Sequence, residues 1–287
     1  MTVVKIENYD GPETAWCPGC GNFSILTSVK HALVKLAIPP YRVLIVSGIG
    51  QASKLPHYLK CNTFNGLHGR ALPVATGAKV ANHELVVLAV AGDGDAYGEG
   101  GNHFFHTMRR NPNITYMVHD NQVYGLTKGQ ASPTSDLGFI TRTTPNGVFT
   151  IPYNPIALAI AGGASFVARS YSGNIEHLTE MIKQGVQHKG FAFIDILQPC
   201  VSFNHLNTYE WYSKRVYNIE DDEDYDPSDK ISAFRKAQVW GDKIPIGIFY
   251  REERKTFEDQ LPQLHEIPLI KHKLDSKVFE VLMDEFL

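Results

Sequence analysis

The chain has 287 residues, of which 43% are hydrophobic and 20% charged, and its formal net charge is -3 at pH 7. These values are ordinary for a globular protein with one large domain, or a core domain with an extension, and give no reason to expect nucleic-acid binding. The N-terminus lacks the pattern of a secretory signal, and no run approaches about 18 apolar residues, so we expect a soluble, cytoplasmic chain without a membrane partner.

Five apolar, β-branched segments predict buried strands, and five segments between them predict helices. In chain order, these are helix 22–37, strand 43–47, helix 70–82, strand 85–91, helix 102–109, strand 114–119, helix 155–162, strand 164–168, helix 175–187 and strand 192–197. This alternation predicts a doubly wound α/β fold with a mostly parallel sheet. The polar segment 130–144 is expected to be a long functional loop. Residues 1–200 are predicted to form the α/β domain, and residues 201–287 a C-terminal extension that contacts a partner.

Polar side chains follow two of the predicted strands at the point where each strand ends. Asp93 lies in the turn after strand 85–91, and Asn121 follows strand 114–119. Ligands of such sheets bind beyond the carboxyl ends of the strands, and carboxylate and amide oxygens suit a Mg²⁺ ion that holds phosphate. We therefore expect Mg²⁺ on Asp93, Asn121 and the Val123 carbonyl, the alternative being a turn without a ligand. A diphosphate cradle is expected at Gly94, Asp95, Gly125 and Leu126.

A second glycine-rich segment, Asn65-Gly66-Leu67-His68-Gly69-Arg70, precedes the helix predicted at 70–82. His68 and Arg70 are candidates to contact the ligand that carries the diphosphate, its phosphates or a substrate carboxylate. The alternative interpretation is an ordinary turn and helix cap.

The four cysteines form a CxxC pair and two distant single residues. Cys17 and Cys20 stand in Trp16-Cys17-Pro18-Gly19-Cys20-Gly21, whereas Cys61 and Cys200 are isolated in the sequence. Disulfides are uncommon in reducing compartments, and all four thiolates together would suit either zinc or a 4Fe–4S cluster. The alternative is four cysteines that are unrelated to one another. A thioredoxin-type redox pair is disfavoured, because no βαβ pattern precedes the CxxC pair.

The motifs CPGCG, LHGR, GDGD and HDNQVYGLTKGQ, in this order, resemble the β subunit of 2-oxoacid:ferredoxin oxidoreductases. The resemblance covers residues 14 to 250. It implies thiamine diphosphate, Mg²⁺ and one 4Fe–4S cluster as cofactors, with cluster ligands Cys17, Cys20 and Cys200. The expected thiamine diphosphate contacts are Ile49, Gly50, Gln51, Ala52, Leu67, His68, Gly69, Arg70, Gly92, Asp93, Gly94, Asp95, Asn121, Tyr124, Gly125 and Leu126.

The fourth cluster ligand is where this chain departs from the family pattern. Many relatives have Gly-Ile-Gly-Cys after the first strand, and here the motif reads Gly48-Ile49-Gly50-Gln51. We expect Cys61, ten residues later, to substitute. The alternative is a cluster on three cysteines with a labile iron.

The resemblance also implies a reaction and partners. It is the coenzyme A-dependent oxidative decarboxylation of a 2-oxoacid, with electrons passed through the cluster to ferredoxin. An α subunit is expected to supply the pyrimidine side of the cofactor, because no Glu of this chain stands in a recognisable motif for activating it. From their positions near the expected cofactor turns, we assign substrate selection to Lys54, Leu126 and Lys128. The lysines could meet a distal carboxylate and so favour 2-oxoglutarate over pyruvate, the alternative being lysines that face solvent. With His68 and Arg70 these residues make up the candidate catalytic set.

Two rival functions remain open from the sequence. One is a subunit of a thiamine diphosphate-dependent decarboxylase or synthase without electron transfer, which has no need of clustered cysteines. The other is a zinc-stabilised subunit without catalytic activity.

Overall fold

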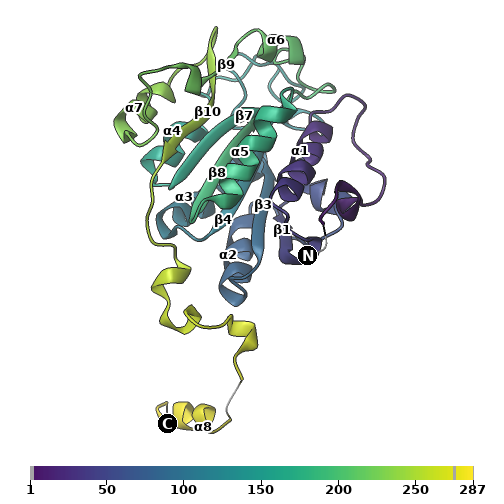
Figure 1. The fold of residues 1–287 in the computed structure, drawn as a ribbon. Helices are drawn as coiled ribbons and strands as arrows, with labels where there is room; N and C mark the ends of the chain where they lie inside the picture. The colour runs from purple at the N-terminus through teal and green to yellow at the C-terminus, as the bar shows by residue number, and fades with distance from the viewer. Residues whose placement is uncertain (1–2, 274–275, 287) are drawn as a thin grey trace.

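The computed structural model describes residues 3–273 and 276–286, and its centre is one sheet of eight strands (Figure 1). The strand order is β2-β1-β3-β4-β8-β7-β10-β9, with all neighbours parallel except β7 and β10. The sheet strands are β1 (Val43–Ser47), β2 (Asn62–Asn65), β3 (Val86–Gly92), β4 (Ile114–Asp120), β7 (Phe166–Tyr171), β8 (Phe191–Leu197), β9 (Val216–Asn218) and β10 (Ile244–Arg251), and a separate hairpin pairs β5 (Val123–Tyr124) with β6 (Gln130–Ala131). The predicted doubly wound, mostly parallel sheet is confirmed.

Helices cover both faces of this sheet (Figure 1). They are α1 (Asn22–Lys35), α2 (Ala71–Ala81), α3 (Gly101–Arg110), α4 (Pro155–Ala161), α5 (Ile175–Gln187), α6 (Tyr209–Ser213), α7 (Lys230–Lys236) and α8 (Ser276–Asp284), with a π-helical turn at Gly94–Glu99. Helix starts follow ordinary capping rules: the Asn174 side chain accepts the His177 amide at the start of α5, and Asn154 caps α4 just before a proline. No helix in the described residues is long and apolar enough to span a bilayer.

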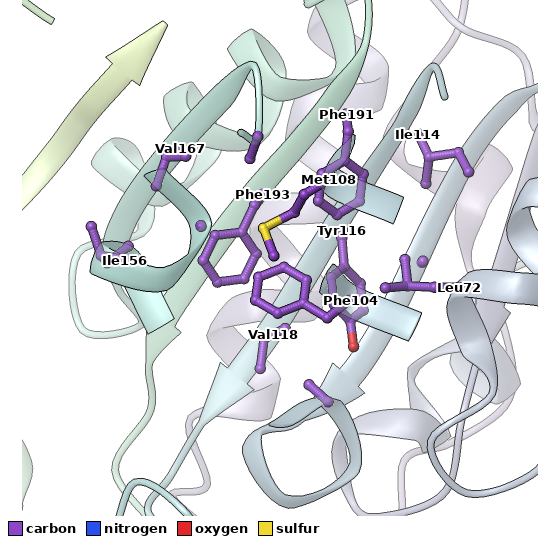
Figure 2. Close-up of a cluster of buried hydrophobic side chains, with 14 of the residues drawn as sticks. Leu72, Phe104, Met108, Ile114, Tyr116, Val118, Ile156, Val167, Phe191 and Phe193 are labelled. Carbon is purple, nitrogen blue, oxygen red and sulfur yellow. The ribbon is translucent and has the colours of Figure 1, made fainter. Parts of the chain in front are cut away.

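Two apolar clusters, one on each face, hold the sheet between the helices. Helices α1 and α5 pack on one face, and α2, α3, α4 and α7 on the other. Phe104 of α3 is fully buried and its ring lies 4.8 Å from that of Phe193 in β8 (Figure 2). Because central strands of a parallel sheet are covered on both faces, they read as continuous apolar runs, which is why the sequence revealed them.

Most predicted boundaries lie within two residues of the observed ones, and the differences have local causes. Helix α1 ends at Lys35, before the expected residue 37, because Ala37 adopts a left-handed backbone with φ of 51°. Helix α3 ends where Asn111 takes the same conformation, with φ of 57°, as asparagine commonly does after a helix. Strand β7 starts two residues later than expected and ends three later.

Strands β2 and β10 do not appear among the predicted elements. β2 is a short edge strand of exposed residues, Asn-Thr-Phe-Asn, so it has no apolar signal. β10 contains Pro245 and Gly247, which disfavour strands, and it joins β7 in antiparallel register with an irregularity between Ile248 and Tyr250. The segment expected to be an extension thus contributes two strands, β9 and β10, to the main sheet. The last part of this segment runs away from the sheet to α8 (Figure 1), where Phe279 and Val281 are exposed. That α8 contacts a partner stays a prediction.

The chain order creates a switch point between β1 and β3. From β1 the chain continues to β2 on one side, whereas from β3 it continues through α3 to β4 on the other. The loops after β1 and β3 therefore diverge and leave a crevice at the carboxyl edge of the sheet, which is where ligands of such folds bind.

Candidate active site

A pocket opens at this switch point. It is lined by segments 49–52, 92–95 and 123–127, together with His68 and Asn121. The structure thus brings together most residues expected to contact thiamine diphosphate, and adds Thr127. Leu67, Gly69 and Arg70 belong to the expected set but do not line the pocket.

Asp93 is the buried carboxylate of this pocket. Its side chain is 1% exposed, and its Oδ2 accepts hydrogen bonds from the hydroxyls of Ser132 (2.5 Å) and Thr134 (2.8 Å). Burial raises the pKa of Asp93 to about 6, and the two hydroxyl donors counteract part of that shift. A divalent cation beside the carboxylate would offset the cost of burying its charge, so Asp93 fits the role of charged Mg²⁺ ligand.

Asn121 and Val123 lie on the opposite wall, after β4. The Asn121 Oδ1 accepts the Val123 amide at 3.1 Å, across Gln122, whose φ is 59°. An amide oxygen has two lone pairs, so one remains for a cation. The donor set of a carboxylate, an amide oxygen and a backbone carbonyl suits Mg²⁺, as expected from the sequence.

A glycine lets the two walls of the pocket approach each other. The Tyr124 ring packs against Gly94 so closely that a Cβ at Gly94 would lie 2.2 Å from a ring carbon. The Tyr124 hydroxyl is 3.4 Å from the Gly94 carbonyl oxygen and from the Glu99 carboxylate. Residue 94 must therefore be glycine for this pocket to keep its shape.

Asp95 organises the second glycine-rich segment. It is 3% exposed, and its Oδ1 accepts the Gly69 amide (2.6 Å) and lies 2.5 Å from the His68 Nδ1. Burial raises the pKa of Asp95, and its bonds to His68 and Gly69 counteract the shift. The Arg70 guanidinium contacts the Gly69 and Glu99 carbonyls, which directs it away from the pocket. The structure therefore brings His68 to the pocket and leaves Arg70 outside it.

The three residues expected to select the substrate lie in three different places. Leu126 lines the pocket, whereas Lys54 lies in the 3-10 helix Ala52–Tyr58 and does not. Lys128 lines an adjoining hollow, which shares Thr127 with the pocket and also contains Arg142. Arg142 was missed because a single cation in a polar loop has no motif around it.

A second pocket contains three of the four cysteines. Cys17, Cys20 and Cys200 line it, and Gln51, Asn121 and Gly125 line both this pocket and the first. The CxxC turn is closed by a hydrogen bond from the Cys20 amide to the Cys17 carbonyl (3.0 Å), and Gly19 provides the φ of 79° that the turn needs.

The pocket's polar atoms indicate that it takes a ligand. Three buried atoms of residues that line it have no hydrogen-bond partner among the described residues: Gln51 Oε1, Gln198 Oε1 and Asn22 Nδ2. Burial raises the pKa of the Cys20 thiol to about 11, helped by nearby Cys200 and Cys17. No three His, Cys, Asp or Glu side chains of the described residues are close enough to hold one metal ion, but a cubane cluster binds each thiolate on a different iron. Three thiols around one pocket fit such a cluster.

Cys61 is the one of the four cysteines that does not line this pocket. The prediction that it supplies the fourth thiolate is wrong, because Cys61 lies at the other end of the strands. In the parallel register, Leu44 pairs with Asn62 and Ser47 with Asn65, so Cys61 lies at the amino end of β1 and β2. At about 3.3 Å per residue, the carboxyl edge of the sheet is roughly 13 Å away. Cys61 packs against the apolar core instead, and burial raises the pKa of its thiol to about 12.

A buried network of polar side chains, which no sequence motif indicates, lies next to Asp93. Thr134 connects Asp93 to Asp120, with its hydroxyl 2.8 Å from a carboxyl oxygen of each. Burial raises the pKa of Asp120 well above its usual range, and neighbouring Asp195 and Asp93 add to the shift. Arg169 balances this charge through an ion pair with Asp195 at 3.1 Å. The available signal was Asp195 itself, an acid within an otherwise apolar strand.

Comparisons with known proteins agree with this geometry. Residues 46–196 match the family described as thiamine pyrophosphate enzyme, C-terminal TPP binding domain, and residues 200–266 match the C-terminal family of the pyruvate ferredoxin oxidoreductase beta subunit. The chain is 44% identical to a 2-oxoacid:ferredoxin oxidoreductase subunit beta of Saccharolobus solfataricus, over 99% of both chains. It is 34% identical to the 2-oxoglutarate synthase subunit KorB of Methanocaldococcus jannaschii, over 92% of this chain and 97% of that one.

A solved structure is similar over the same length. The 2-oxoglutarate:ferredoxin oxidoreductase from Magnetococcus marinus, with 2-oxoglutarate, coenzyme A and succinyl-CoA bound, superposes with a TM-score of 0.91 at 38% identity, covering 99% of this chain and 97% of that one. With the pocket at the switch point and the cysteine pocket beside it, these similarities establish that the chain belongs to the β subunits of the 2-oxoacid:ferredoxin oxidoreductases.

Proposed function

We propose that this β subunit takes part in the coenzyme A-dependent oxidative decarboxylation of a 2-oxoacid, with 2-oxoglutarate preferred over pyruvate. In this proposal the first pocket holds thiamine diphosphate and Mg²⁺, and the cysteine pocket holds a 4Fe–4S cluster that passes electrons to ferredoxin. The observation that carries it is the wall common to both pockets, formed by Gln51, Asn121 and Gly125. An electron donor and an electron acceptor bound on the two sides of one wall would be close enough for direct electron transfer.

The residues of the first pocket have distinct tasks in this proposal. When bound, thiamine diphosphate supplies the nucleophilic carbon that adds to the keto group and the electron sink for loss of carbon dioxide. Asp93 and Asn121 orient the diphosphate through Mg²⁺, and Ser132 and Thr134 hold the Asp93 carboxylate in place. Tyr124 and Leu126 line the pocket and would limit the access of water to a bound cofactor.

A second subunit is needed to complete the site. Among the residues that line the first pocket, the acids are Asp93 and Asp95, and both are engaged by hydroxyl, imidazole or amide donors. Neither is free to contact an aminopyrimidine ring, which in thiamine-dependent enzymes like these is activated by a carboxylate. We therefore assign that carboxylate to the α subunit, which also agrees with the relatives' designation as β subunits.

The preference for 2-oxoglutarate rests on the hollow beside the first pocket. Lys128 and Arg142 both line it, and Thr127 joins it to the pocket. Two cations there would stabilise the distal carboxylate of a dicarboxylate substrate, whereas pyruvate has no group that reaches them. The Magnetococcus enzyme, whose structure contains 2-oxoglutarate, is consistent with this preference.

The test is reconstitution with the α subunit. We expect the complex to reduce ferredoxin or a viologen dye only when thiamine diphosphate, Mg²⁺, coenzyme A and a 2-oxoacid are all present, and the β chain alone to be inactive. Lys128→Met and Arg142→Met are expected to lower kcat/KM for 2-oxoglutarate by about 10-fold or more, and for pyruvate much less. Lys183→Met is the matched control, because Lys183 lies on α5, is 31% exposed and lines neither pocket.

Three results would contradict the proposal at different points. Turnover by the β chain alone would remove the need for an α subunit. Decarboxylation without iron and without dye reduction would favour a simple thiamine-dependent decarboxylase or synthase. Zinc in the cysteine pocket and no binding of thiamine diphosphate would favour a non-catalytic subunit.

A further inference from the structure

The cysteine pocket presents three thiols and, on one further side, an amide oxygen. Gln51 lines it together with Cys17, Cys20 and Cys200, whereas Cys61 lies at the other end of the sheet. The Gln51 Oε1 is buried and has no hydrogen-bond partner among the described residues. This atom is therefore in a place where a ligand, and not the protein, must satisfy it.

The Gln51 backbone is held in place by the segment that carries the CxxC pair. The indole nitrogen of Trp16 donates to the Gln51 carbonyl at 2.8 Å, and Trp16 directly precedes Cys17. The Gln51 side chain packs beside Gly125, with its Cγ 3.7 Å from where a Cβ on Gly125 would be, which is an ordinary contact distance. A side chain fixed on both sides whose buried oxygen is left unpaired costs about 1–3 kcal/mol, unless a bound group pairs with that oxygen.

The second amide in the pocket, Gln198, also has an unpaired buried oxygen among the described residues, but its nitrogen is bonded to a cysteine. Gln198 is 2% exposed, and its Nε2 donates to the Cys20 sulfur at 3.3 Å. That bond fixes Gln198 against one thiol, where it can tune a thiolate ligand. Gln51 lines the same pocket and has no such hydrogen bond to a cysteine among the described residues, so it is the candidate for the position that no thiol occupies.

We propose that the cluster in this chain is held by three thiolates, and that its fourth iron faces the Gln51 amide oxygen and has no cysteine ligand. The proposal rests on the proposed function, which assigns a 4Fe–4S cluster to Cys17, Cys20 and Cys200. A neutral oxygen binds iron more weakly than a thiolate does, so this iron is the one that leaves first.

Two properties follow from the missing thiolate. On oxidation by ferricyanide, the cluster of charge 2+ gives one electron to ferricyanide and releases one Fe²⁺ ion, which leaves a 3Fe–4S cluster of charge 1+. Before iron loss, a neutral ligand leaves the cluster one negative charge short of a four-thiolate site, so its reduction potential is higher.

The experiment uses the full chain in complex with its α subunit, purified without oxygen. Iron and sulfide are assayed, and electron paramagnetic resonance is recorded before and after stoichiometric ferricyanide. We expect the wild-type cluster of this subunit to fall from about four to about three irons with the signal of a 3Fe–4S cluster, and Fe²⁺ with a thiol reductant to restore it. Gln51→Cys is expected to retain its iron and to have a lower reduction potential.

Matched variants separate Gln51 from the other candidates. Cys61→Ser is expected to behave as the wild type, because Cys61 is remote from the pocket, and Gln198→Cys is expected to give no protection against iron loss. Gln51→Ala keeps the comparison informative if the cysteine variant folds poorly, and it is expected to lose the fourth iron at least as readily as the wild type.

The inference is overturned if wild-type iron resists ferricyanide, if Cys61→Ser alone lowers the iron content, or if Gln198→Cys protects the cluster and Gln51→Cys does not. These outcomes leave the proposed function intact, because a cluster is still present. A complex without iron and sulfide in this subunit would instead refute the cluster itself, and with it both proposals.

Discussion

Replacing the Thr134 side chain tests most directly how Asp93, the proposed Mg²⁺ ligand, is held in place. Its hydroxyl lies 2.8 Å from both Asp93 Oδ2 and Asp120 Oδ1, and its side chain is 4% exposed. A hydroxyl has one proton, so it can donate to only one of the two carboxyl groups. Burial and the neighbouring acids raise the pKa of Asp120 well above its usual range, which favours donation by Thr134 to Asp93.

The size of the effect follows from these two bonds. A hydrogen bond to an ionised carboxylate contributes about 1.5–3 kcal/mol, and one between neutral groups about 1 kcal/mol. Thr134→Val keeps the shape of the side chain and removes both bonds, so we expect the free energy of unfolding to fall by about 2.5–4 kcal/mol. Thr134→Ser keeps the hydroxyl and is expected to recover most of this loss.

Urea unfolding of the full chain, followed by circular dichroism, measures this change, and calorimetry measures the affinity for thiamine diphosphate with Mg²⁺. Thr144→Val is the matched control, because the Thr144 hydroxyl lies in the same half-buried loop and bonds to the Thr141 hydroxyl and to no carboxylate among the described residues. It is expected to change stability by less than about 0.5 kcal/mol. If Thr134→Val behaves like this control in both assays, Thr134 does not support Asp93 and our account of the site is wrong.

Three further predictions concern the cofactor, the pH dependence and the core. Asp93→Asn is expected to weaken binding of thiamine diphosphate with Mg²⁺ by more than about 100-fold, and a loss below about 10-fold in calorimetry would contradict Mg²⁺ coordination there. Burial lowers the pKa of His188 in the folded state to about 4, from 6.5, so on acidification the unfolded chain binds a proton before the folded chain does. The free energy of unfolding should therefore fall as the pH drops below about 6.5, by about 2 kcal/mol near pH 5. Urea titrations at several pH values measure this slope, and His188→Gln should flatten it. Phe104→Ala is expected to cost about 3–5 kcal/mol, against under about 1 kcal/mol for exposed Phe105→Ala; equal losses would refute the assigned core.

The sequence predicted the central fold well because its signals are local. β8 reads Phe-Ala-Phe-Ile-Asp-Ile-Leu and is buried throughout, and α5 starts at an asparagine cap, so both elements are visible without tertiary information. β10 is different, because Pro245 and Gly247 are tolerated only through its pairing with β7 and β9. Such pairing is a property of the assembled sheet and has no local signature.

In the candidate site too, the residues with a local sequence signal were predicted, and those placed only by the tertiary fold were not. Asp93 and Asn121 follow apolar strands, and the ends of parallel strands must meet at one edge, so their proximity could be inferred. Ser132 and Thr134 reach Asp93 from about 40 positions further along the chain, through a loop whose path no pattern specifies. Cys61 failed as a ligand for the opposite reason: elimination among four cysteines cannot tell which end of a strand a residue occupies.

The wall between the two pockets places Gln51 beside both of them. Gln51 follows β1, whereas Asn121 and Gly125 follow β4, and β3 with its Asp93 turn lies between these strands. The loops after β1 and β4 therefore have to cross over the end of β3 to meet, and where they meet they separate the first pocket from the cysteine pocket. A side chain at residue 51 is consequently constrained by both neighbours. An amide can present its oxygen to one pocket while its backbone stays fixed by Trp16, and this is why a substitution at residue 51 should alter the properties of the cluster without dismantling the Mg²⁺ site.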